Sequence, residues 1–574
     1  MLQRLRYAVI MRIVLTTLHS KYIHASLALP LLAAYCQDIG TDLRILEFTV
    51  HEPKEQVLGT LLAEEPEVIA FSVYIWNRRQ TLELADALVT ARPGLRIVLG
   101  GPEVSFDGPE LLENHFGVNA VIRGEGELPL RGLLEAWQQD RLPTEVPRLT
   151  WRDSDKIREN SEGPLLADLD DIPSPLQLGL IDLSRGFVYL ETSRGCPYRC
   201  AFCMSALDQQ VRSYSMARIE QDLQLLMEKQ VAKIKLVDRT FNYDPERAHH
   251  IFAFILRHNH GSHFHFEIGG HLLNEKTLEL LATVPKDTFQ FEIGVQSTLP
   301  NTLKTIDRPE ALELLGQNIH RLRRKSHIHL HLDLIAGLPG EGFQDVLTSI
   351  DRVAALRPHH LQLEPVKLLP GAPLRQAATR HGISFDPHPP YSVLATQQLS
   401  FNELERLQGF GRLLDLTQNA DRGHHFLEAM SETCGSLSTG LEQLEQFWRQ
   451  QGLFRRSLSQ RDLFYHLWAF VRAGYSGRPL ARLGECLGWD LAVSERIPQH
   501  KAPEFLDTDL STSEQQRVRA RMQRIVATLK GRSIKVQHLA ALFHHQPQLP
   551  ENSLVLFLYL TRPGRPMQIR QLLP

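Results

Sequence analysis

Two series of short apolar runs, each run followed by a segment with helical periodicity, constrain the fold of this chain more than any other feature. The first series extends over residues 12–126 and the second over residues 187–369. Strands that alternate with helices at this pitch pair in parallel, because each helix returns the chain to the same end of the sheet. Ligands of such sheets bind at the carboxyl ends of the strands. We therefore expect two α/β domains with their functional residues at those ends.

The two series differ in the sheets that they predict. The first predicts a doubly wound, Rossmann-like sheet. The second contains six strand and helix units, too few to close an eight-stranded barrel, and predicts an open, partial (β/α)6 barrel. Beyond residue 375 the pattern is mostly helical, ends in a strand-like run at 552–560 and contains no motif that we recognise.

A proline-rich and acidic segment separates the two series and predicts a linker. It contains the run ADLDDIPSP and Pro143, Pro147, Pro164, Pro173 and Pro175. The chain of 574 residues is long enough for three or four domains of about 150 residues each. We expect a first domain at residues 11–140, the linker at 141–185, a second domain at 186–375 and a mostly helical third domain at 376–574.

The charge balance excludes several classes of protein. The net charge is −3, with 63 Lys and Arg against 66 Asp and Glu, so no overall field draws the chain to nucleic acid or to an anionic membrane. The basic run HRLRRK at 320–325 lies on a predicted helix and is typical of a solvated face. No apolar run reaches the ~20 residues of a membrane span. We expect a cytoplasmic protein that has no membrane span and does not bind nucleic acid.

Half of the six cysteines fall within eight residues, in the segment GCPYRCAFC after the first strand of the second series. The spacing Cys196-x-x-x-Cys200-x-x-Cys203 supplies thiolates for three irons of a [4Fe-4S] cluster and leaves the fourth iron for another ligand. The alternative is a structural zinc, which needs a fourth ligand such as His249 or His250 from another element. The remaining cysteines are scattered, which is no disulfide framework and predicts a reducing compartment.

The cysteine loop resembles the signature of the radical S-adenosylmethionine (radical SAM) enzymes. DLIAGLPGE (333–341) is similar to the fifth-strand motif of that family, and FEIGVQST (291–298) to its fourth strand. The resemblance implies that Cys196, Cys200 and Cys203 bind a [4Fe-4S] cluster, which cleaves S-adenosylmethionine reductively with electrons from a partner such as flavodoxin or ferredoxin. VDRTFN (237–242) stands in place of the Gly-Gly-Glu motif that binds the methionine amine in many members, with Asp238 as the expected substitute. The implied contacts to S-adenosylmethionine are Phe202, Asp238, Glu292, Gln296, Ser297, Arg308, Gly337 and Leu338.

The first domain resembles the cobalamin-binding domain of a subgroup of these enzymes, through GGPE (100–103) and IRGEGE (122–127). The implied cobalamin contacts are Ser72, Gly100, Gly101, Pro102, Gly124 and Glu125. Many such domains ligate cobalt with a histidine from an Asp-x-His-x-x-Gly loop. Here that loop keeps His19 without the aspartate or the glycine, so we expect no histidine on cobalt. With the helical tail, these runs are similar to a bacterial group that has a C-terminal domain of unknown function.

We expect an enzyme that uses these cofactors to methylate an unactivated carbon of an unknown small molecule. The alternative is a cobalamin-dependent cyclase or rearrangement enzyme without net methylation, and product mass separates the two. An RNA methylthiotransferase would need three further cysteines in the first domain, where only Cys36 occurs. A cofactor-sensing module without catalysis is a further alternative, but the intact cysteines and fifth-strand motif favour an enzyme.

Polar and aliphatic side chains alternate along the fifth strand of the second series. One face carries His327, His329, His331 and Asp333. Together with Glu267 and Glu292, this face would give the barrel a polar interior for substrate binding or proton transfer. The alternative is that helices cover the polar face. We expect the polar interior, because the outer face of a barrel strand packs under helices and favours the aliphatic set.

Overall fold

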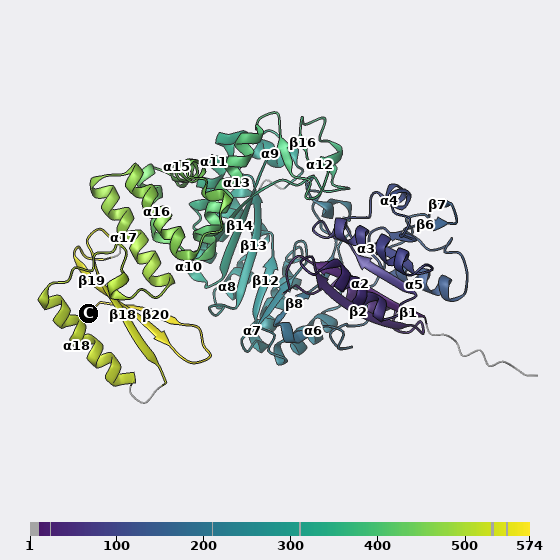
Figure 1. The fold of residues 1–574 in the computed structure, drawn as a ribbon, viewed down its shortest axis with the longest axis horizontal. Helices are drawn as coiled ribbons and strands as arrows, with labels where there is room; N and C mark the ends of the chain where they lie inside the picture. The colour runs from purple at the N-terminus through teal and green to yellow at the C-terminus, as the bar shows by residue number, and fades with distance from the viewer. Residues whose placement is uncertain are drawn as a thin grey trace, which may run out of the picture. The chain divides into compact units, whose positions relative to one another are not determined.

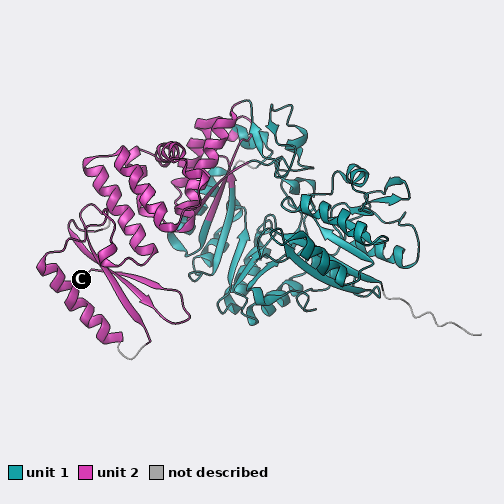
Figure 2. Ribbon diagram, viewed as in Figure 1, with its two compact units in different colours: residues 1–294, 301–330, 366–397 teal, residues 295–300, 331–365, 398–574 magenta. Residues whose placement is uncertain are grey.

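The computed structural model describes residues 11–22, 24–208, 210–308, 311–529, 533–546 and 549–573, and Figure 1 shows the order of its elements. The chain divides into two compact units (Figure 2). Unit 1 comprises residues 1–294, 301–330 and 366–397, and unit 2 comprises residues 295–300, 331–365 and 398–574. In the part of the chain that the structure describes, no helix combines the length and the apolar character needed to cross a membrane.

The first sheet lies in unit 1 and has the strand order β2-β1-β3-β4-β5-β6-β7. Its strands are β1 (Arg12–His19), β2 (Asp42–Thr49), β3 (Val68–Ser72), β4 (Arg96–Gly100), β5 (Ala120–Ile122), β6 (Leu149–Asp153) and β7 (Lys156–Glu159). Between them run α1 (Ala28–Tyr35), α2 (Lys54–Ala63), α3 (Arg78–Ala91), α4 (Gly108–Asn114) and α5 (Glu127–Gln138). Strands β1 to β5 pair in parallel. Apolar residues of α2, α3 and α4 pack on one face of the sheet and those of α1 and α5 on the other, as a doubly wound fold requires.

The segment that we expected to be a linker contributes β6 and β7, which extend this sheet in the antiparallel direction. Pairing with β6 covers the edge of β5, whose backbone groups would otherwise be open. Trp151 on β6 is 3% exposed and joins the core beneath α5. The prolines and acidic residues that suggested a linker lie outside these two short strands.

The second sheet has six strands in the order β15-β14-β13-β12-β11-β8. They are β8 (Phe187–Leu190), β11 (Lys233–Leu236), β12 (His263–Glu267), β13 (Phe289–Gln296), β14 (His329–Ala336) and β15 (His360–Pro365). The helices of this region are α6 (Met216–Glu228), α7 (Pro245–His258), α8 (Glu275–Leu281), α9 (Pro300–Thr305), α10 (Leu312–Lys325) and α11 (Phe343–Ala354). Six strands with helical crossovers form the open, partial barrel that the second series predicted.

Aromatic packing determines which face of β12 and β13 lies under the helices of unit 1. Phe252 of α7 contacts Phe266 of β12 and Phe291 of β13, with ring centroids 5.0 and 5.6 Å apart. These three rings are fully buried. Because side chains alternate along a strand, His265 and Glu292 lie on the opposite, inner face. In unit 2, β14 shows the same division, since Leu332 and Leu334 are almost fully buried and Asp333 is partly exposed.

The remainder of unit 2 follows residue 397. Its helices are α13 (Phe401–Leu416), α14 (His424–Cys434), α15 (Leu437–Gln450), α16 (Gln460–Gly474), α17 (Gly477–Ser494) and α18 (Thr512–Leu529). They are joined by an antiparallel sheet of β18 (Lys535–Phe543), β19 (Ser553–Thr561) and β20 (Gln568–Leu572). Trp489 of α17 packs on Phe557 of β19, and Val518 of α18 joins the apolar cluster that contains Leu556 of the same strand. The sequence predicted a mostly helical region at 376–574 with one strand, which is β19. Among the described residues of that region, the structure also contains β18, β20 and two short strands, β16 (Ser384–Phe385) and β17 (Val393–Ala395).

Candidate functional site

The cysteine loop leaves the carboxyl end of β8 and is closed at its base by two short antiparallel strands, β9 (Ser193–Arg194) and β10 (Arg212–Ser213). Gly195 has φ +87°, and a Cβ there would lie 2.4 Å from the carbonyl oxygen of Gln210, so the turn needs glycine. The backbone N–H of Cys196 donates to the carbonyl of Asp208 at 3.0 Å. Cys196 and Cys200 are buried and Cys203 is partly exposed.

Each cysteine sulfur has a polar neighbour. Thr240 Oγ1 lies 3.5 Å from the Sγ of Cys196, and the backbone N–H of Ser205 donates to the Sγ of Cys203 at 3.4 Å. Arg308 donates from Nη1 to the Sγ of Cys200 at 3.5 Å. Thiolates with hydrogen-bond donors directed at their sulfurs are the ligands that iron–sulfur clusters use, so these residues fit a [4Fe-4S] cluster.

Arg308 was predicted to contact S-adenosylmethionine, and the structure places its guanidinium between the cysteine loop and the fourth barrel strand. Besides the sulfur of Cys200, it donates to the carbonyl oxygen of Gly294 on β13. Burial raises the pKa of the Cys200 thiol, and the positive charge of Arg308 opposes that shift without cancelling it. Arg308 therefore ties β13 to the cysteine loop and favours the thiolate form of one ligand.

Asp238 follows β11 and is 1% exposed. Its carboxylate accepts hydrogen bonds from the backbone N–H of Thr192 at 3.2 Å and from the Thr192 hydroxyl at 2.6 Å. The hydroxyl of Ser193 donates to it as well, at 2.5 Å. These three hydrogen bonds connect the Asp238 carboxylate to Thr192 and Ser193, which lead into the cysteine loop. Phe202, which was also predicted to contact S-adenosylmethionine, lies on the cysteine loop itself and is half-buried.

In unit 2, the end of β13 meets the loop that follows β14. Ser297 donates from its hydroxyl to the carboxylate of Glu341, and both residues are 1% exposed. Burial raises the pKa of Glu341 to about 7, although the hydrogen bond from Ser297 acts in the opposite direction. Gly337, at the start of this loop, has φ +88°, in the left-handed region that glycine adopts readily, and Leu338 after it is fully buried. Gln296, beside Ser297, has φ +70°, a conformation that side chains rarely adopt.

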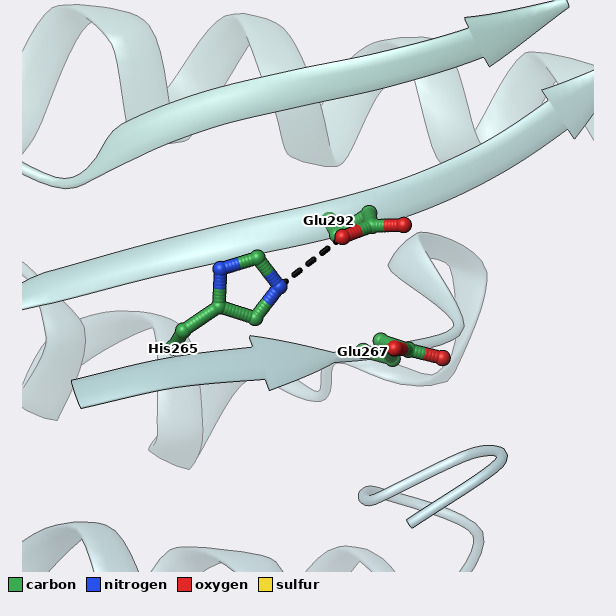
Figure 3. A group of neighbouring side chains, drawn as sticks. All are labelled: His265, Glu267 and Glu292. Carbon is green, nitrogen blue, oxygen red and sulfur yellow. Dashed lines mark hydrogen bonds and ion pairs between the residues drawn. The ribbon is translucent and has the colours of Figure 1, made fainter. Parts of the chain in front are cut away.

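Glu292 was predicted to contact S-adenosylmethionine, and the structure places it in a polar quartet with Lys235, His265 and Glu267 on the inner face of unit 1. Figure 3 shows three members of this quartet, His265, Glu267 and Glu292. His265 Nε2 lies 2.9 Å from a carboxylate oxygen of Glu292. The ammonium of Lys235 lies 3.2 Å from Glu267 and 3.6 Å from Glu292. On β13, Gly294 follows Glu292 on the same inner face, because alternate residues of a strand share a face. Arg308 donates both to the carbonyl of Gly294 and to the sulfur of Cys200, so the quartet lies near the cysteine loop.

The same quartet contains a possible set of metal ligands. One ligand atom each from His265, Glu267 and Glu292 lies within 4.8 Å of the others. Lys235, however, already places a cation between the two carboxylates. Burial lowers the pKa of Lys235, but the two carboxylates raise it by more, so the net pKa is raised and the ammonium form is favoured. The quartet is therefore suited to hydrogen bonding with a polar group in the barrel interior.

The predicted cobalamin contacts lie at the carboxyl ends of β3, β4 and β5. Ser72 and Gly100 are register partners, and Pro102 follows in the loop after β4. Gly101 has φ +107°, and a Cβ there would lie 2.5 Å from the carbonyl oxygen of Val73. The Ser105 hydroxyl donates to the carbonyl of Gly101 at 2.8 Å and accepts from the N–H of Gly124 at 3.1 Å. Two glycine loops thus lie together at this edge, and Gly124 is exposed, which fits close approach of a broad, flat ligand such as a corrin.

Three residues that the sequence reasoning missed lie at the same edge. Asn77 is fully buried, and its amide donates to the hydroxyl of Thr17 at 3.2 Å and to the carbonyl of Leu18 at 3.0 Å. Tyr74 and Trp76 stack with ring centroids 4.6 Å apart and an interplanar angle of 5°, and Trp76 is 45% exposed. The only sequence signal was an aromatic pair directly after a strand. His19, the last residue of β1, pairs with Glu47, and its Nε2 lies 3.1 Å from the Glu47 carboxylate.

Glu125 was predicted to contact cobalamin, and the structure pairs it with the two arginines that flank the cysteine loop. Arg194 Nη1 lies 3.3 Å from the Glu125 carboxylate, and Arg212 Nη1 donates to it at 3.2 Å. Arg194 also pairs with Glu127 at 2.7 Å. Burial raises the pKa of Glu125, but the two guanidinium groups lower it by more, so the net pKa is lowered and the carboxylate is ionised. All of these residues belong to unit 1, and they join the loop after β5 to the cysteine loop.

Comparison with known families agrees with this site. Residues 190–353 match the radical SAM superfamily. More narrowly, residues 13–134 match the B12 binding domain and residues 379–542 match a family of unknown function, DUF4080. The chain therefore contains a B12 binding domain, a radical SAM domain and a DUF4080 domain, in this order. These domains imply S-adenosylmethionine, a [4Fe-4S] cluster and cobalamin as cofactors.

The chain is 28% identical over 335 residues to the cobalamin-dependent radical SAM methyltransferase TokK of Streptomyces tokunonensis, covering 54% of this chain and 48% of that protein. It is 26% identical over 367 residues to the 2-(S-pantetheinyl)-carbapenam-3-carboxylate methyltransferase of Streptantibioticus cattleyicolor, covering 58% and 51%. The chain thus spans about half the length of these relatives. The solved structure of OxsB, a cobalamin-dependent S-adenosylmethionine radical enzyme, aligns with a TM-score of 0.61 and 16% identity over 84% of both chains, which shows a shared fold.

Proposed function

We propose that the protein methylates an unactivated carbon of a small molecule, with S-adenosylmethionine, a [4Fe-4S] cluster and cobalamin as cofactors. One observation carries the proposal: Glu125 pairs with Arg194 and Arg212, which holds the loop assigned to cobalamin against the loop that bears the cysteines. A reaction that uses both cofactors on one substrate needs them close together. The two relatives described above are named as methyltransferases, which supports methylation over cyclisation or rearrangement.

The chain supplies ligands and positioning groups around these cofactors. When bound, the cluster supplies an electron for cleavage of S-adenosylmethionine, and cobalamin supplies a methyl group. Cys196, Cys200 and Cys203 hold the cluster. Arg308 is a positioning residue in this proposal, since it fixes β13 against Cys200.

Three further groups of residues complete the assignment. Asp238 is a second positioning residue, because its bonds to Thr192 and Ser193 orient the entry to the cysteine loop. Binding of S-adenosylmethionine falls to Phe202, Gln296, Ser297, Gly337 and Leu338, and binding of cobalamin to Ser72, Gly100, Gly101, Pro102 and Gly124.

The polar quartet binds the substrate in this proposal. The side chains of Glu267, Glu292 and Lys235 are between 25% and 30% exposed, so they can accept or donate further hydrogen bonds on the inner face. His265 is 5% exposed and orients Glu292. We also propose a cytoplasmic location and a reducing partner of the flavodoxin or ferredoxin type, and we expect no salt-dependent binding of RNA.

The test begins with anaerobic reconstitution by iron, sulfide and hydroxocobalamin, followed by metal analysis. We expect about four irons and one cobalt for each chain. Cys203→Ala should lose the cluster, whereas Cys434→Ala, outside the loop, should retain it. The reconstituted protein is then incubated with reductant, small-molecule extract and S-adenosylmethionine labelled in its methyl group. Label in a small-molecule product, with S-adenosylhomocysteine beside 5′-deoxyadenosine, supports methylation. A product without label contradicts it and supports cyclisation or rearrangement.

A further inference from the structure

A segment of unit 1 that follows the sixth barrel strand contacts both cofactor loops. We call residues 366–397 the strap. It contains the short helix α12 (Pro373–Gln376) and the strands β16 (Ser384–Phe385) and β17 (Val393–Ala395), which pair with each other. The strap closes on itself, because Leu368 N donates to the carbonyl of Tyr391 at 2.9 Å and Arg375 Nη1 donates to the carbonyl of Leu368 at 2.7 Å.

One end of the strap is bonded to the cysteine loop. The N–H of Leu374 donates to the carbonyl of Ala201, which lies between two cluster cysteines, at 2.7 Å. The N–H of Ala201 in turn donates to the carbonyl of Ile306 at 2.8 Å. Leu374 is 1% exposed, so this hydrogen bond is shielded from water. A movement of the strap at Leu374 is therefore transmitted to the backbone that carries the cysteines.

The other end of the strap is bonded to the glycine loop after β4. The hydroxyl of Tyr391 donates to the carboxylate of Glu103, the residue that ends the GGPE run. Tyr391 and Glu103 are each 4% exposed, and Arg78 holds the same loop by donating to the carbonyl of Glu103 at 2.6 Å. The end that carries Leu374 also contacts this glycine loop, because Gly371 lies against the ring of Phe106 and a Cβ there would come within 2.3 Å of it.

Tyr391 is held in an unfavourable backbone conformation. Its φ is +60°, in the left-handed region that side chains other than glycine rarely adopt. The guanidinium of Arg375 lies 4.7 Å above its ring. A strained residue persists where its surroundings over-determine its position, and such residues concentrate at functional sites. Besides its contacts to Arg375 and Glu103, Tyr391 donates from its N–H to the carbonyl of His388 at 2.8 Å, and its own carbonyl accepts from Leu368, so backbone and side chain together hold it in place.

We propose that the strap sets the position of the cobalamin-binding loop relative to the cysteine loop, and that Tyr391 is its positioning residue. The cofactors named here rest on the proposed function, whereas the strap contacts stand on the geometry alone. The hydrogen bond between Tyr391 and Glu103 connects the glycine loop to a segment whose other contact, from Leu374 to Ala201, reaches the cysteines. The strap thus fixes the separation between the site that supplies the methyl group and the site where S-adenosylmethionine is cleaved.

The first test uses the full chain without cofactors and measures amide hydrogen exchange in the segments 101–107 and 388–393. Tyr391→Phe keeps the buried ring and removes only the hydroxyl. Because a hydrogen bond to a buried carboxylate is lost, we expect exchange to become about tenfold faster in both segments. Glu103→Gln keeps an acceptor and should change exchange much less, and Tyr465→Phe in α16 is the matched control. Should Tyr391→Phe not accumulate as folded protein, Glu103→Leu removes the same bond from the other side.

The second test uses the reconstituted, reduced protein and measures microwave-power saturation of the cob(II)alamin electron spin resonance signal. A nearby paramagnetic cluster accelerates relaxation steeply with decreasing distance, so Tyr391→Phe should change the half-saturation power and Glu103→Gln should not. Unchanged saturation in Tyr391→Phe, or faster exchange confined to 388–393, would overturn the inference. If the parent protein binds no cobalamin, the proposed function fails, and hydrogen exchange still decides whether the strap restrains the glycine loop.

Discussion

The buried carboxyl of Glu341 makes the stability of unit 2 depend on pH. Its pKa is about 7 in the folded chain and 4.5 for an ordinary glutamate, because burial disfavours the charged form. When folding raises the pKa of a carboxyl group, the group stabilises the fold fully at a pH below its pKa in the unfolded chain. That stabilisation is lost as the pH rises through its pKa in the folded chain. The difference of 2.5 (7 minus 4.5) corresponds to about 3 kcal/mol, since one pKa unit is about 1.4 kcal/mol. Glu341 is 1% exposed, so solvent screening does not reduce this figure.

Glu341→Gln removes this ionisation and keeps an acceptor for Ser297. We expect the variant to match the parent near pH 4.5 and to exceed it above pH 7 by about 3 kcal/mol in free energy of unfolding. Ser297→Ala should have the opposite effect, a steeper loss of stability with rising pH, because its hydroxyl favours the ionised carboxylate. The assay is urea unfolding of the cofactor-free protein between pH 4.5 and 8.5, combined with hydrogen exchange in the segment 337–345. Parallel stability curves for Glu341→Gln and the parent would refute the reasoning.

Three further predictions concern the first domain and its connection to the cysteine loop. Trp76→Ala should weaken hydroxocobalamin binding by about tenfold in equilibrium dialysis, because an exposed aromatic stack is lost, without changing iron content. Gly101→Ala should lower the free energy of unfolding by at least about 1 to 3 kcal/mol, since the methyl group meets Val73 and φ is positive. An unchanged melting temperature would contradict this. Arg212→Ala leaves Glu125 with Arg194 as its remaining arginine partner and should cost about 1 to 3 kcal/mol in unfolding experiments. A loss below about 0.5 kcal/mol would show that the pair is a weak surface contact.

Local patterns in the sequence were sufficient to predict the parallel strands of the first two sheets and the grouping of the three cysteines on one loop. The three cysteines lie on one short loop, so their spacing alone determines that the thiolates lie together. The alternation along β13 places Phe291 and Glu292 on opposite faces whatever the rest of the chain does, because successive side chains of a strand point in opposite directions. Strands and helices that follow one another closely likewise predict parallel pairing.

Contacts between residues far apart in the chain were decided only by the tertiary structure. Glu125 belongs to the run IRGEGE, which resembles cobalamin domains, yet its carboxylate pairs with Arg212, 87 positions away. Asp238 is directed at Thr192, 46 positions away, and Tyr391 reaches Glu103 across 288 positions. Nothing in the neighbourhood of these residues distinguishes their partners from other polar groups. Strand register and the packing of one loop on another select the partner, and both depend on residues far away in the chain.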